Sequence, residues 1–361
     1  MPRFPLTPVV ALLFLCLLPT LSFNIGVVSN SRSSGFRRCD KIGHSVRDTF
    51  TTQLFAIGAL ARKAKEAEVK QWLEAGGAEE VKNVMLEMSG DAHIEVQPLL
   101  KDAITKRRRT LSVVAEYKRN FKGDGYVNEI FEPDLMSPIF REFGASACAV
   151  MTDKRVGGCD YDDLKTVTDE QENSRGDVPG PLPVVCSDMI VADEQIARAK
   201  LNGAQAVLLQ LGLLNEEVLK GMMEKAAKIG LETVVQASTE EEVKTAVSLG
   251  AKIIKVNSIE EIEVKEEWRE MMGEDVTAVA DISANDNKQL EEVEEAWKLR
   301  DAGYQAVWVS DCLYKSGNDP TEHAGAIIQA MKAKSSVKYA SPRSKSGKGE
   351  GSREYLGDIM M

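Results

Sequence analysis

The chain has 361 residues, of which 43% are hydrophobic and 28% are charged, and its net charge is −11. This composition supports a sizeable folded core and excludes a largely disordered chain. The acidic balance argues against binding of nucleic acid, because nucleic-acid-binding proteins need a basic face that neutralises phosphates. Three His and six Cys, none in a C-x-x-C pair, argue against a zinc site or a His-dependent triad, so we expect no bound metal.

Residues 1–40 have the composition of a targeting leader. Arg3 precedes the apolar run Val9–Leu18, which is too short to span a bilayer and is typical of a signal-peptide core. The alternative for this run is a buried N-terminal strand. After Phe23 the chain is rich in Ser and Arg and poor in acids, as transit peptides are. Together the two parts resemble the bipartite leaders of algae with secondary plastids.

We therefore expect delivery to the plastid stroma and no membrane association once the leader is removed. Plain secretion is the alternative, but it favours paired Cys. Cys148, Cys186 and Cys312 each fall within an apolar run that is typical of a strand or a strand end. We interpret them as reduced packing residues, which suits a stroma better than the outside of a cell.

Residues 48–110 show helical periodicity that Gly76, Gly77 and Gly90 interrupt. After them, short apolar runs recur, and each pair of runs is separated by enough residues for a helix. The predicted strands are Leu111–Lys118, Ala147–Met151, Leu182–Cys186, Ala206–Gln210, Glu232–Gln236, Ile253–Asn257, Val276–Asp281 and Ala306–Val309.

Eight strands that alternate with helices predict an α/β fold, a (β/α)8 TIM barrel with an N-terminal helical extension. Glycines at 144, 203, 250 and 303 precede four of the strands, as expected where a helix ends in a left-handed residue. A doubly wound open sheet is the alternative, although no G-x-G-x-x-G follows any strand. The barrel and its extension should occupy residues 48–331, and the basic Ser- and Gly-rich tail 332–361 should be disordered.

Barrel enzymes build their sites at the C-terminal ends of the strands. The residues at those ends form a mostly polar ring: Glu116, Lys118, Thr152, Ser187, Asp188, Gln210, Gln236, Asn257, Asp281, Ser283, Ser310 and Asp311. Glu116 and Lys118 are two residues apart, so both should point into the barrel mouth, either as a structural ion pair or as an acid–base pair. Ser283 and Ser310 follow the last two strands, where small residues let backbone N–H groups reach a phosphate.

These residues resemble the indole-3-glycerol phosphate synthase family of tryptophan biosynthesis. Its first-strand motif, Ala-Glu-x-Lys-Arg, matches residues 115–119. Further matches are the second strand with its loop, the third-strand motif, and the fourth and sixth strands, at residues 143–158, 183–188, 202–209 and 250–257. The resemblance covers roughly residues 50–330, and in that family the segment before the barrel covers the active site.

The resemblance implies ring closure of a carboxyphenylamino-deoxyribulose phosphate with loss of carbon dioxide and water. It implies proton transfer by Glu116 and Lys118, with help from Asp281. Asn257, Gln236 and Ser187 would contact the substrate, and Ser283 and Ser310 would hold its phosphate. This chemistry requires no cofactor. An enzyme of the same pathway is the expected protein partner, and a small phosphorylated compound is the expected ligand.

The chain departs from the family at several of these positions. The third-strand lysine, which is the family's principal general acid, is Ser187, and the arginine before it is Cys186. The fifth-strand glutamate is Gln236, and the seventh-strand Glu-Ser-Gly is residues 281–283, Asp-Ile-Ser. A serine hydroxyl cannot protonate a ketone oxygen as an ammonium can.

Two hypotheses follow from these substitutions. In the first, the protein is an active synthase, or a lyase acting on a related phosphorylated sugar, in which Lys118 or Lys122 supplies the missing ammonium. In the second, it is a catalytically degenerate barrel that binds a phosphorylated ligand or a pathway partner.

Overall fold

The computed structural model describes residues 58–90, 94–105, 110–121, 125–126, 132–257, 261–282, 289–314 and 320–333. Within them, eight parallel strands close into a barrel in the order β1-β10-β9-β8-β7-β6-β5-β4. The strands are β1 (Ser112–Tyr117), β4 (Ala147–Met151), β5 (Val184–Ser187), β6 (Ala206–Gln210), β7 (Glu232–Ala237), β8 (Ile253–Val256), β9 (Thr277–Asp281) and β10 (Ala306–Val309). The predicted (β/α)8 barrel is confirmed, and all eight strands lie where the sequence places them.

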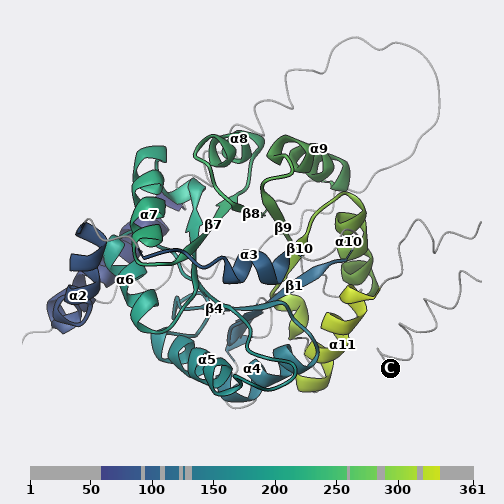
Figure 1. Ribbon diagram of the computed structural model, residues 1–361, viewed down its shortest axis with the longest axis horizontal. Coiled ribbons are helices and arrows are strands. Elements are labelled where there is room, and N and C mark those ends of the chain that lie inside the picture. Colours follow the sequence, from purple (N-terminus) through teal and green to yellow (C-terminus); the bar gives the residue numbers. More distant parts are fainter. Residues whose placement is uncertain are drawn as a thin grey trace, which may run out of the picture. The chain divides into compact units, whose positions relative to one another are not determined.

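Helices surround the barrel (Figure 1). They are α4 (Pro133–Glu142), α5 (Tyr161–Asn173), α6 (Asp193–Leu201), α7 (Glu216–Lys228), α8 (Glu240–Ser248), α9 (Ile262–Met272), α10 (Gln289–Asp301) and α11 (Pro320–Lys332). Four helices end at the predicted glycines 144, 203, 250 and 303, which all have positive φ. No helix in the described part of the chain is both long and apolar enough to cross a bilayer.

The helices that precede the barrel form the predicted N-terminal extension. Residues 58–72 are helical, the short π-helix η1 (Leu73–Gly77) follows, and α2 (Ala78–Ser89) ends at Gly90. Gly76 has a φ of 117°, and a Cβ on Gly77 would lie 2.3 Å from the Trp72 ring, so the bend at this glycine pair requires its small residues. From this bend, α2 packs against α6 and α7.

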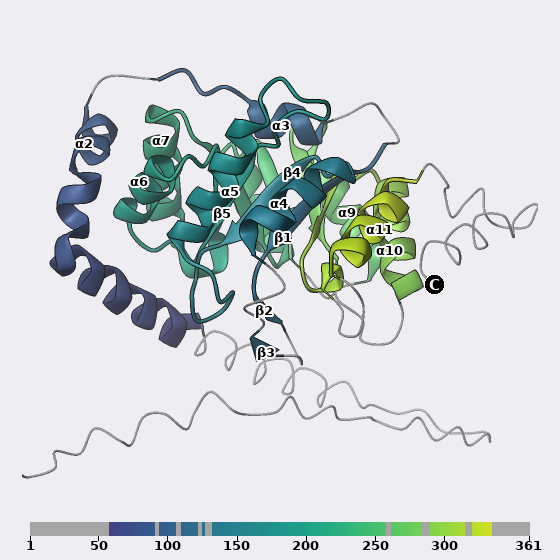
Figure 2. The same ribbon diagram turned by 90° about the horizontal axis from the view of Figure 1, so that it is seen from below.

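A short helix, α3 (Leu99–Ile104), closes the N-terminal end of the barrel. Its Leu100 and Ile104 are buried together with the side chains that fill the barrel interior. Figure 2 shows α3 at one end of the barrel and the short hairpin β2 (Asn120–Phe121) and β3 (Gly125–Tyr126) at the other end. The hairpin, which the sequence did not predict, therefore marks the open end, where the strands terminate. We call this open end the mouth.

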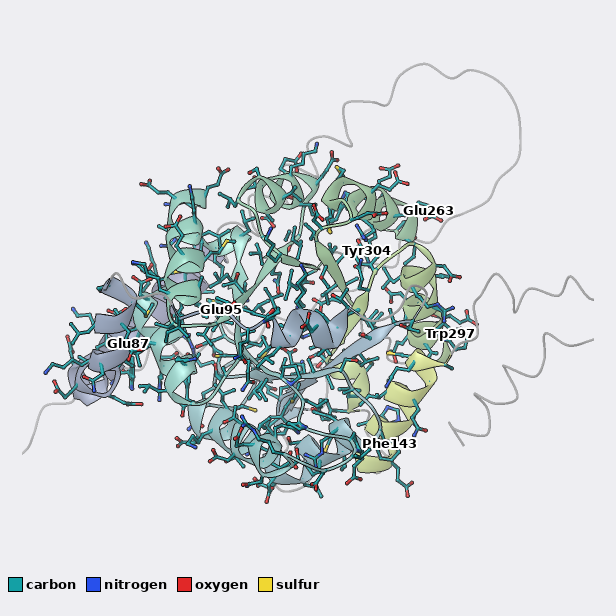
Figure 3. The ribbon with its side chains drawn as sticks, viewed as in Figure 1. Glu87, Glu95, Phe143, Glu263, Trp297 and Tyr304 are labelled. Carbon is teal, nitrogen blue, oxygen red and sulfur yellow. The ribbon has the colours of Figure 1, made fainter. Side chains whose placement is uncertain are left out.

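The core has two parts because each barrel strand is covered on both faces. Inward side chains such as Val114, Leu208 and Val279 form a cluster inside the barrel, and outward side chains pack under the helices. Trp268 and Trp297 belong to the outer layer. Figure 3 shows Trp297 on α10 beside α11, where its indole N–H donates to the carbonyl of Ala330 at 3.2 Å.

The predicted leader, residues 1–40, lies outside the described residues. The predicted tail begins at 332, and α11 extends to Lys332, so only the first two residues of the tail are described. Lys122 and Ser283 also lie outside the described residues.

Candidate active site at the mouth of the barrel

Side-chain alternation along the strands decides which residues enter the mouth. Val114, Val185, Val234 and Val279 point into the barrel, so residues two positions further along each strand also point inward. These inward residues are Glu116 on β1, Ser187 on β5, Gln236 on β7 and Asp281 on β9. The structure thus brings four of the predicted site residues together on the inner face near the mouth.

Glu116 and Ser187 form a buried pair across two strands. The Ser187 hydroxyl donates to Oε1 of Glu116 at 2.7 Å, and each residue is 3% exposed. The backbone carbonyl of Glu116 also accepts a hydrogen bond from the Tyr314 hydroxyl at 2.9 Å. Ser187 therefore orients the carboxylate of Glu116, a role that the sequence did not predict.

Lys255 on β8 is the residue that the sequence analysis missed. Its Nζ lies 2.9 Å from Oδ2 of Asp281 and 3.2 Å from Oε1 of Gln236, and it stands 4.7 Å from the centre of the Trp308 ring. The alternation from Ile253 places it inside the barrel. The available signal was a lysine in the middle of the apolar run Ile-Ile-Lys-Val, because lysine is almost never fully buried without a partner.

Asp281 is the more accessible partner of this ion pair. Its side chain is 21% exposed, against 6% for the side chain of Lys255. Burial raises the pKa of the Asp281 carboxyl, the Lys255 ammonium opposes that rise, and the negative charge of Glu116 adds to it. Glu116 and Asp281 therefore influence each other electrostatically across the mouth.

Lys118 lies one residue beyond β1 and pairs with Asp311, which begins the turn η3 (Asp311–Leu313) after β10. Glu116 and Lys118 were predicted to form a pair with each other, but the structure gives them different partners: Ser187 for Glu116 and Asp311 for Lys118. The ammonium of Lys118 screens the carboxylate of Asp311, which would otherwise repel an anion held by the loop after β10.

Of the two residues predicted to hold phosphate, Ser310 is described and Ser283 is not. The Ser310 hydroxyl oxygen is buried and finds no hydrogen-bond partner among the described residues. A buried hydroxyl without a partner is costly, so this atom is free to bind a ligand oxygen. Asn257, predicted to orient the substrate, is exposed just beyond β8, and its backbone N–H donates to the carbonyl of Ala237 at 2.9 Å.

The helix formed by residues 58–72 is fastened to the rim of the mouth. Lys65 is 2% exposed, and its Nζ lies 2.8 Å from Asp188 and 3.2 Å from Asp153, which follow β5 and β4. Burial would lower the pKa of the Lys65 ammonium, but the carboxylates of Asp188 and Asp153 raise it above its usual value. We call these two ion pairs of Lys65 the clamp. The clamp fixes the loop directly after Ser187.

The described cysteines of the barrel, Cys148, Cys159, Cys186 and Cys312, are all buried. Cys148, Cys159 and Cys186 are free thiols. Burial raises the pKa of the Cys186 thiol to about 12, so the thiol is neutral at physiological pH and is not a nucleophile. Cys148, Cys186 and Cys312 are therefore packing residues, as predicted.

Comparison with known proteins identifies the family of this barrel. The model of the indole-3-glycerol phosphate synthase family matches residues 62–321. The chain belongs to this family. The indole-3-glycerol phosphate synthase of Leptospira interrogans is 33% identical over 159 residues, which are 44% of this chain and 59% of that protein.

Other synthases match over longer stretches. The indole-3-glycerol phosphate synthase of Listeria welshimeri is 30% identical over 217 residues, which are 59% of this chain and 81% of that protein. That of a Parafrankia species is 27% identical over 244 residues, which are 66% of this chain and 85% of that protein. The chain spans 59% of the first of these curated relatives. The family match thus covers all eight barrel strands and most of the N-terminal extension, including every described residue of the mouth.

Proposed function

We propose that the protein closes the indole ring of carboxyphenylamino-deoxyribulose phosphate, the reaction of indole-3-glycerol phosphate synthase in tryptophan biosynthesis. The observation that carries the proposal is the charge pattern of the mouth. Two ammonium–carboxylate pairs, Lys118–Asp311 and Lys255–Asp281, lie at one end of a synthase-family barrel together with the buried carboxylate of Glu116.

The reaction needs the groups that these residues provide. A ring carbon of the substrate attacks its ketone carbon, the ketone oxygen takes up a proton, and carbon dioxide and water then leave. Ammonium groups stabilise the developing negative charge at the ketone oxygen, and a carboxylate accepts the proton that is lost as water leaves. Glu116, held by Ser187 and shielded from solvent, is the proposed base.

A buried hydroxyl near the end of β10 supports the same substrate, because it could contact a phosphate oxygen. The Ser310 hydroxyl is buried and unpartnered among the described residues, and Lys118 places a positive charge beside the following residue, Asp311. We assign the phosphate to this side of the mouth; Ser283, the second predicted phosphate contact, lies outside the described residues. Asn257 and Gln236 would contact the sugar part of the substrate, because they lie at the ends of adjacent strands.

A barrel that binds the phosphorylated ligand without turnover is the second candidate function. The observation that favours it is Ser187 itself. Its hydroxyl is occupied by Glu116 and has the acidity of an alcohol, so it cannot serve as a proton donor to the ketone.

We also propose that the protein works in the plastid stroma, with secretion as the alternative, and that an enzyme of the same pathway is its partner. The free, buried thiols of Cys148, Cys159 and Cys186 support a reducing compartment, because extracellular domains tend to pair their cysteines. Expression of residues 1–47 fused to a fluorescent protein in an alga with secondary plastids tests this localisation. Fluorescence outside the plastid would overturn the proposed plastid localisation.

The function is tested by turnover of carboxyphenylamino-deoxyribulose phosphate, followed by the fluorescence of the indole product. The full chain and a chain starting at Lys41 are measured in parallel. We expect turnover above background, and we expect Glu116→Gln to lower kcat by about 10²- to 10⁴-fold, the usual contribution of one acid–base group. Glu79→Gln is the matched control, because Glu79 is exposed on α2.

A folded, monodisperse sample without turnover would contradict the proposed reaction. Binding of the substrate analogue in which the ketone is reduced to an alcohol then tests the second candidate. Saturable binding that Ser310→Ala weakens would identify a phosphate-binding barrel without catalysis.

A further inference from the structure

We infer that Lys255 is the general acid that protonates the ketone oxygen during ring closure. The inference rests on the proposed function and assigns the proton donor within the same site. It names a residue on the sixth barrel strand, three strands away from Ser187 in the order of the barrel.

The position of Lys255 is unusual for a lysine. The barrel interior around it is apolar, with Val234, Ile253 and Val279 on the same and adjacent strands. Its ammonium nevertheless lies inside, held by the carboxylate of Asp281, the amide oxygen of Gln236 and the face of Trp308. Three neighbours thus orient the ammonium group of Lys255, as a proton donor requires.

Stability does not account for this ion pair. Two charges removed from water lose about as much hydration energy as their attraction returns, and replacing a buried pair by apolar residues is often neutral or stabilising. The N-terminal layers of this barrel are filled by apolar residues such as Val114 and Leu208, so the fold itself does not need the charges. The pair is also open toward the mouth, because the side chain of Asp281 is 21% exposed.

The geometry of the barrel lets Lys255 serve the same substrate as Glu116. The interior of an eight-stranded barrel is just wide enough for side chains from its strands to meet. The carboxylates of Glu116 and Asp281 interact electrostatically, so groups on β1 and β9 affect each other across the mouth. A ketone bound between them is within reach of the ammonium that Asp281 holds.

Gln236 fits this assignment better than a carboxylate would. Its amide oxygen accepts a hydrogen bond from Lys255 without adding a second negative charge.

A new bond forms between the ring carbon and the ketone carbon, and the carbonyl π electrons move to oxygen. The oxygen takes a proton from the Lys255 ammonium and becomes a hydroxyl group, which leaves a neutral amine beside Asp281. Solvent at the exposed side of Asp281 returns the proton to the amine.

The test compares kcat, KM and pH profiles of four variants: Lys255→Met, Lys255→Arg, Lys118→Met and Lys255→Met combined with Ser187→Lys. Lys252→Met is the matched control, because Lys252 is exposed just before the same strand. We expect Lys255→Met to lower kcat by about 10²- to 10⁴-fold with little change in KM. Lys255→Arg should also have a low kcat, because a guanidinium keeps its proton at every working pH and cannot donate it to the ketone.

The pH profile separates chemistry from a structural role. For the wild-type protein, kcat should fall at alkaline pH as the donor loses its proton, and this alkaline limb should be absent in Lys255→Met. Ser187→Lys returns an ammonium to the mouth beside Glu116, so the double variant should regain kcat and an alkaline limb at a new pH. Binding of the ketone-reduced substrate analogue and near-ultraviolet circular dichroism confirm that each variant is folded. If Lys255→Met does not fold, the variant with Asp281→Asn in addition is measured in its place, because it leaves no unpaired charge.

Each outcome is informative. A folded wild-type protein without turnover overturns the proposed function and this inference with it. Turnover that Lys255→Met leaves unchanged, or an alkaline limb that disappears in Lys118→Met and persists in Lys255→Met, overturns the inference alone. Loss of kcat in Lys255→Met with no recovery on adding Ser187→Lys, together with weaker binding of the analogue, would assign Lys255 to binding and would also overturn it.

Discussion

The two ends of the barrel handle buried charge in opposite ways. At the closed end, the carboxylate of Glu232 on β7 accepts hydrogen bonds from the backbone N–H groups of Leu100 and Lys101, at 2.5 and 3.1 Å. It thereby satisfies the first turn of α3, which plugs that end. At the mouth, charged side chains pair with one another, and the buried Ser310 hydroxyl and Trp308 indole N–H lack partners among the described residues. The closed end is built to hold the fold together, whereas the mouth leaves polar groups available to a ligand.

The largest effect on stability is expected at the rim of the mouth. Lys65→Met removes the cation that neutralises Asp188 and Asp153, and leaving buried carboxylates uncompensated costs about 3–5 kcal/mol. Chemical denaturation measures the free energy of unfolding. The exposed Lys63 on the same helix is the control, and Lys63→Met should change stability by less than about 0.5 kcal/mol. Equal stability of the two variants would show that the clamp does not hold the rim.

A smaller loss is expected at the closed end. Glu232→Ala leaves the N–H groups of Leu100 and Lys101 without their acceptor, which should cost about 2–3 kcal/mol. Glu232→Gln keeps one acceptor oxygen in the same place and should cost about 1 kcal/mol. Thermal and chemical unfolding report both values. Turnover per folded molecule should stay at the wild-type level, and a fall in kcat would show that the two ends are not separate in function.

The smallest effect concerns the pH dependence of the mouth. Burial raises the pKa of the Asp281 carboxyl, so the carboxylate that holds Lys255 is lost at a higher pH than an ordinary aspartate. The raised pKa lies above the value of about 3.9 that is usual for aspartate. As pH falls through this raised pKa, Asp281 becomes protonated, its ion pair with Lys255 breaks, and kcat should decline. Asp281→Asn should remove this acid limb from whatever activity remains. An unchanged limb in that variant would assign it to another group.

Several features of the fold could be predicted from the sequence because local rules determine them. Three predicted strands, Ala147–Met151, Ala206–Gln210 and Ala306–Val309, have the observed bounds. The glycine pair at 76 and 77 was predicted to interrupt a helix, and the chain bends there. In both cases the signal lies within a few neighbouring residues, as an apolar run between helical segments or as a residue without a Cβ.

The site was harder to predict, and Lys255 shows why. Strands covered on both faces are apolar on both faces, so alternation along the sequence does not say which side chains point inward. The strand ends indicated Glu116, Ser187, Gln236 and Asp281, and the structure places all four near the mouth, because position along the strand is enough for that. Lys255 precedes the end of its strand, and only the closed barrel shows that its side chain points inward to Asp281.

By itself the sequence determined the alternation of strands and helices, the helical extension, and the set of polar residues at the strand ends. Local conformational preferences and hydrophobic periodicity carry that information. The tertiary structure alone decided the partners of those residues: Ser187 with Glu116, Lys118 with Asp311, and Lys255 with Asp281. Two of these three pairs join residues that are far apart in the chain, for example 71 residues for Ser187 and Glu116. The physical reason is that register and closure of the barrel bring such residues within a few ångströms, and no local pattern encodes either.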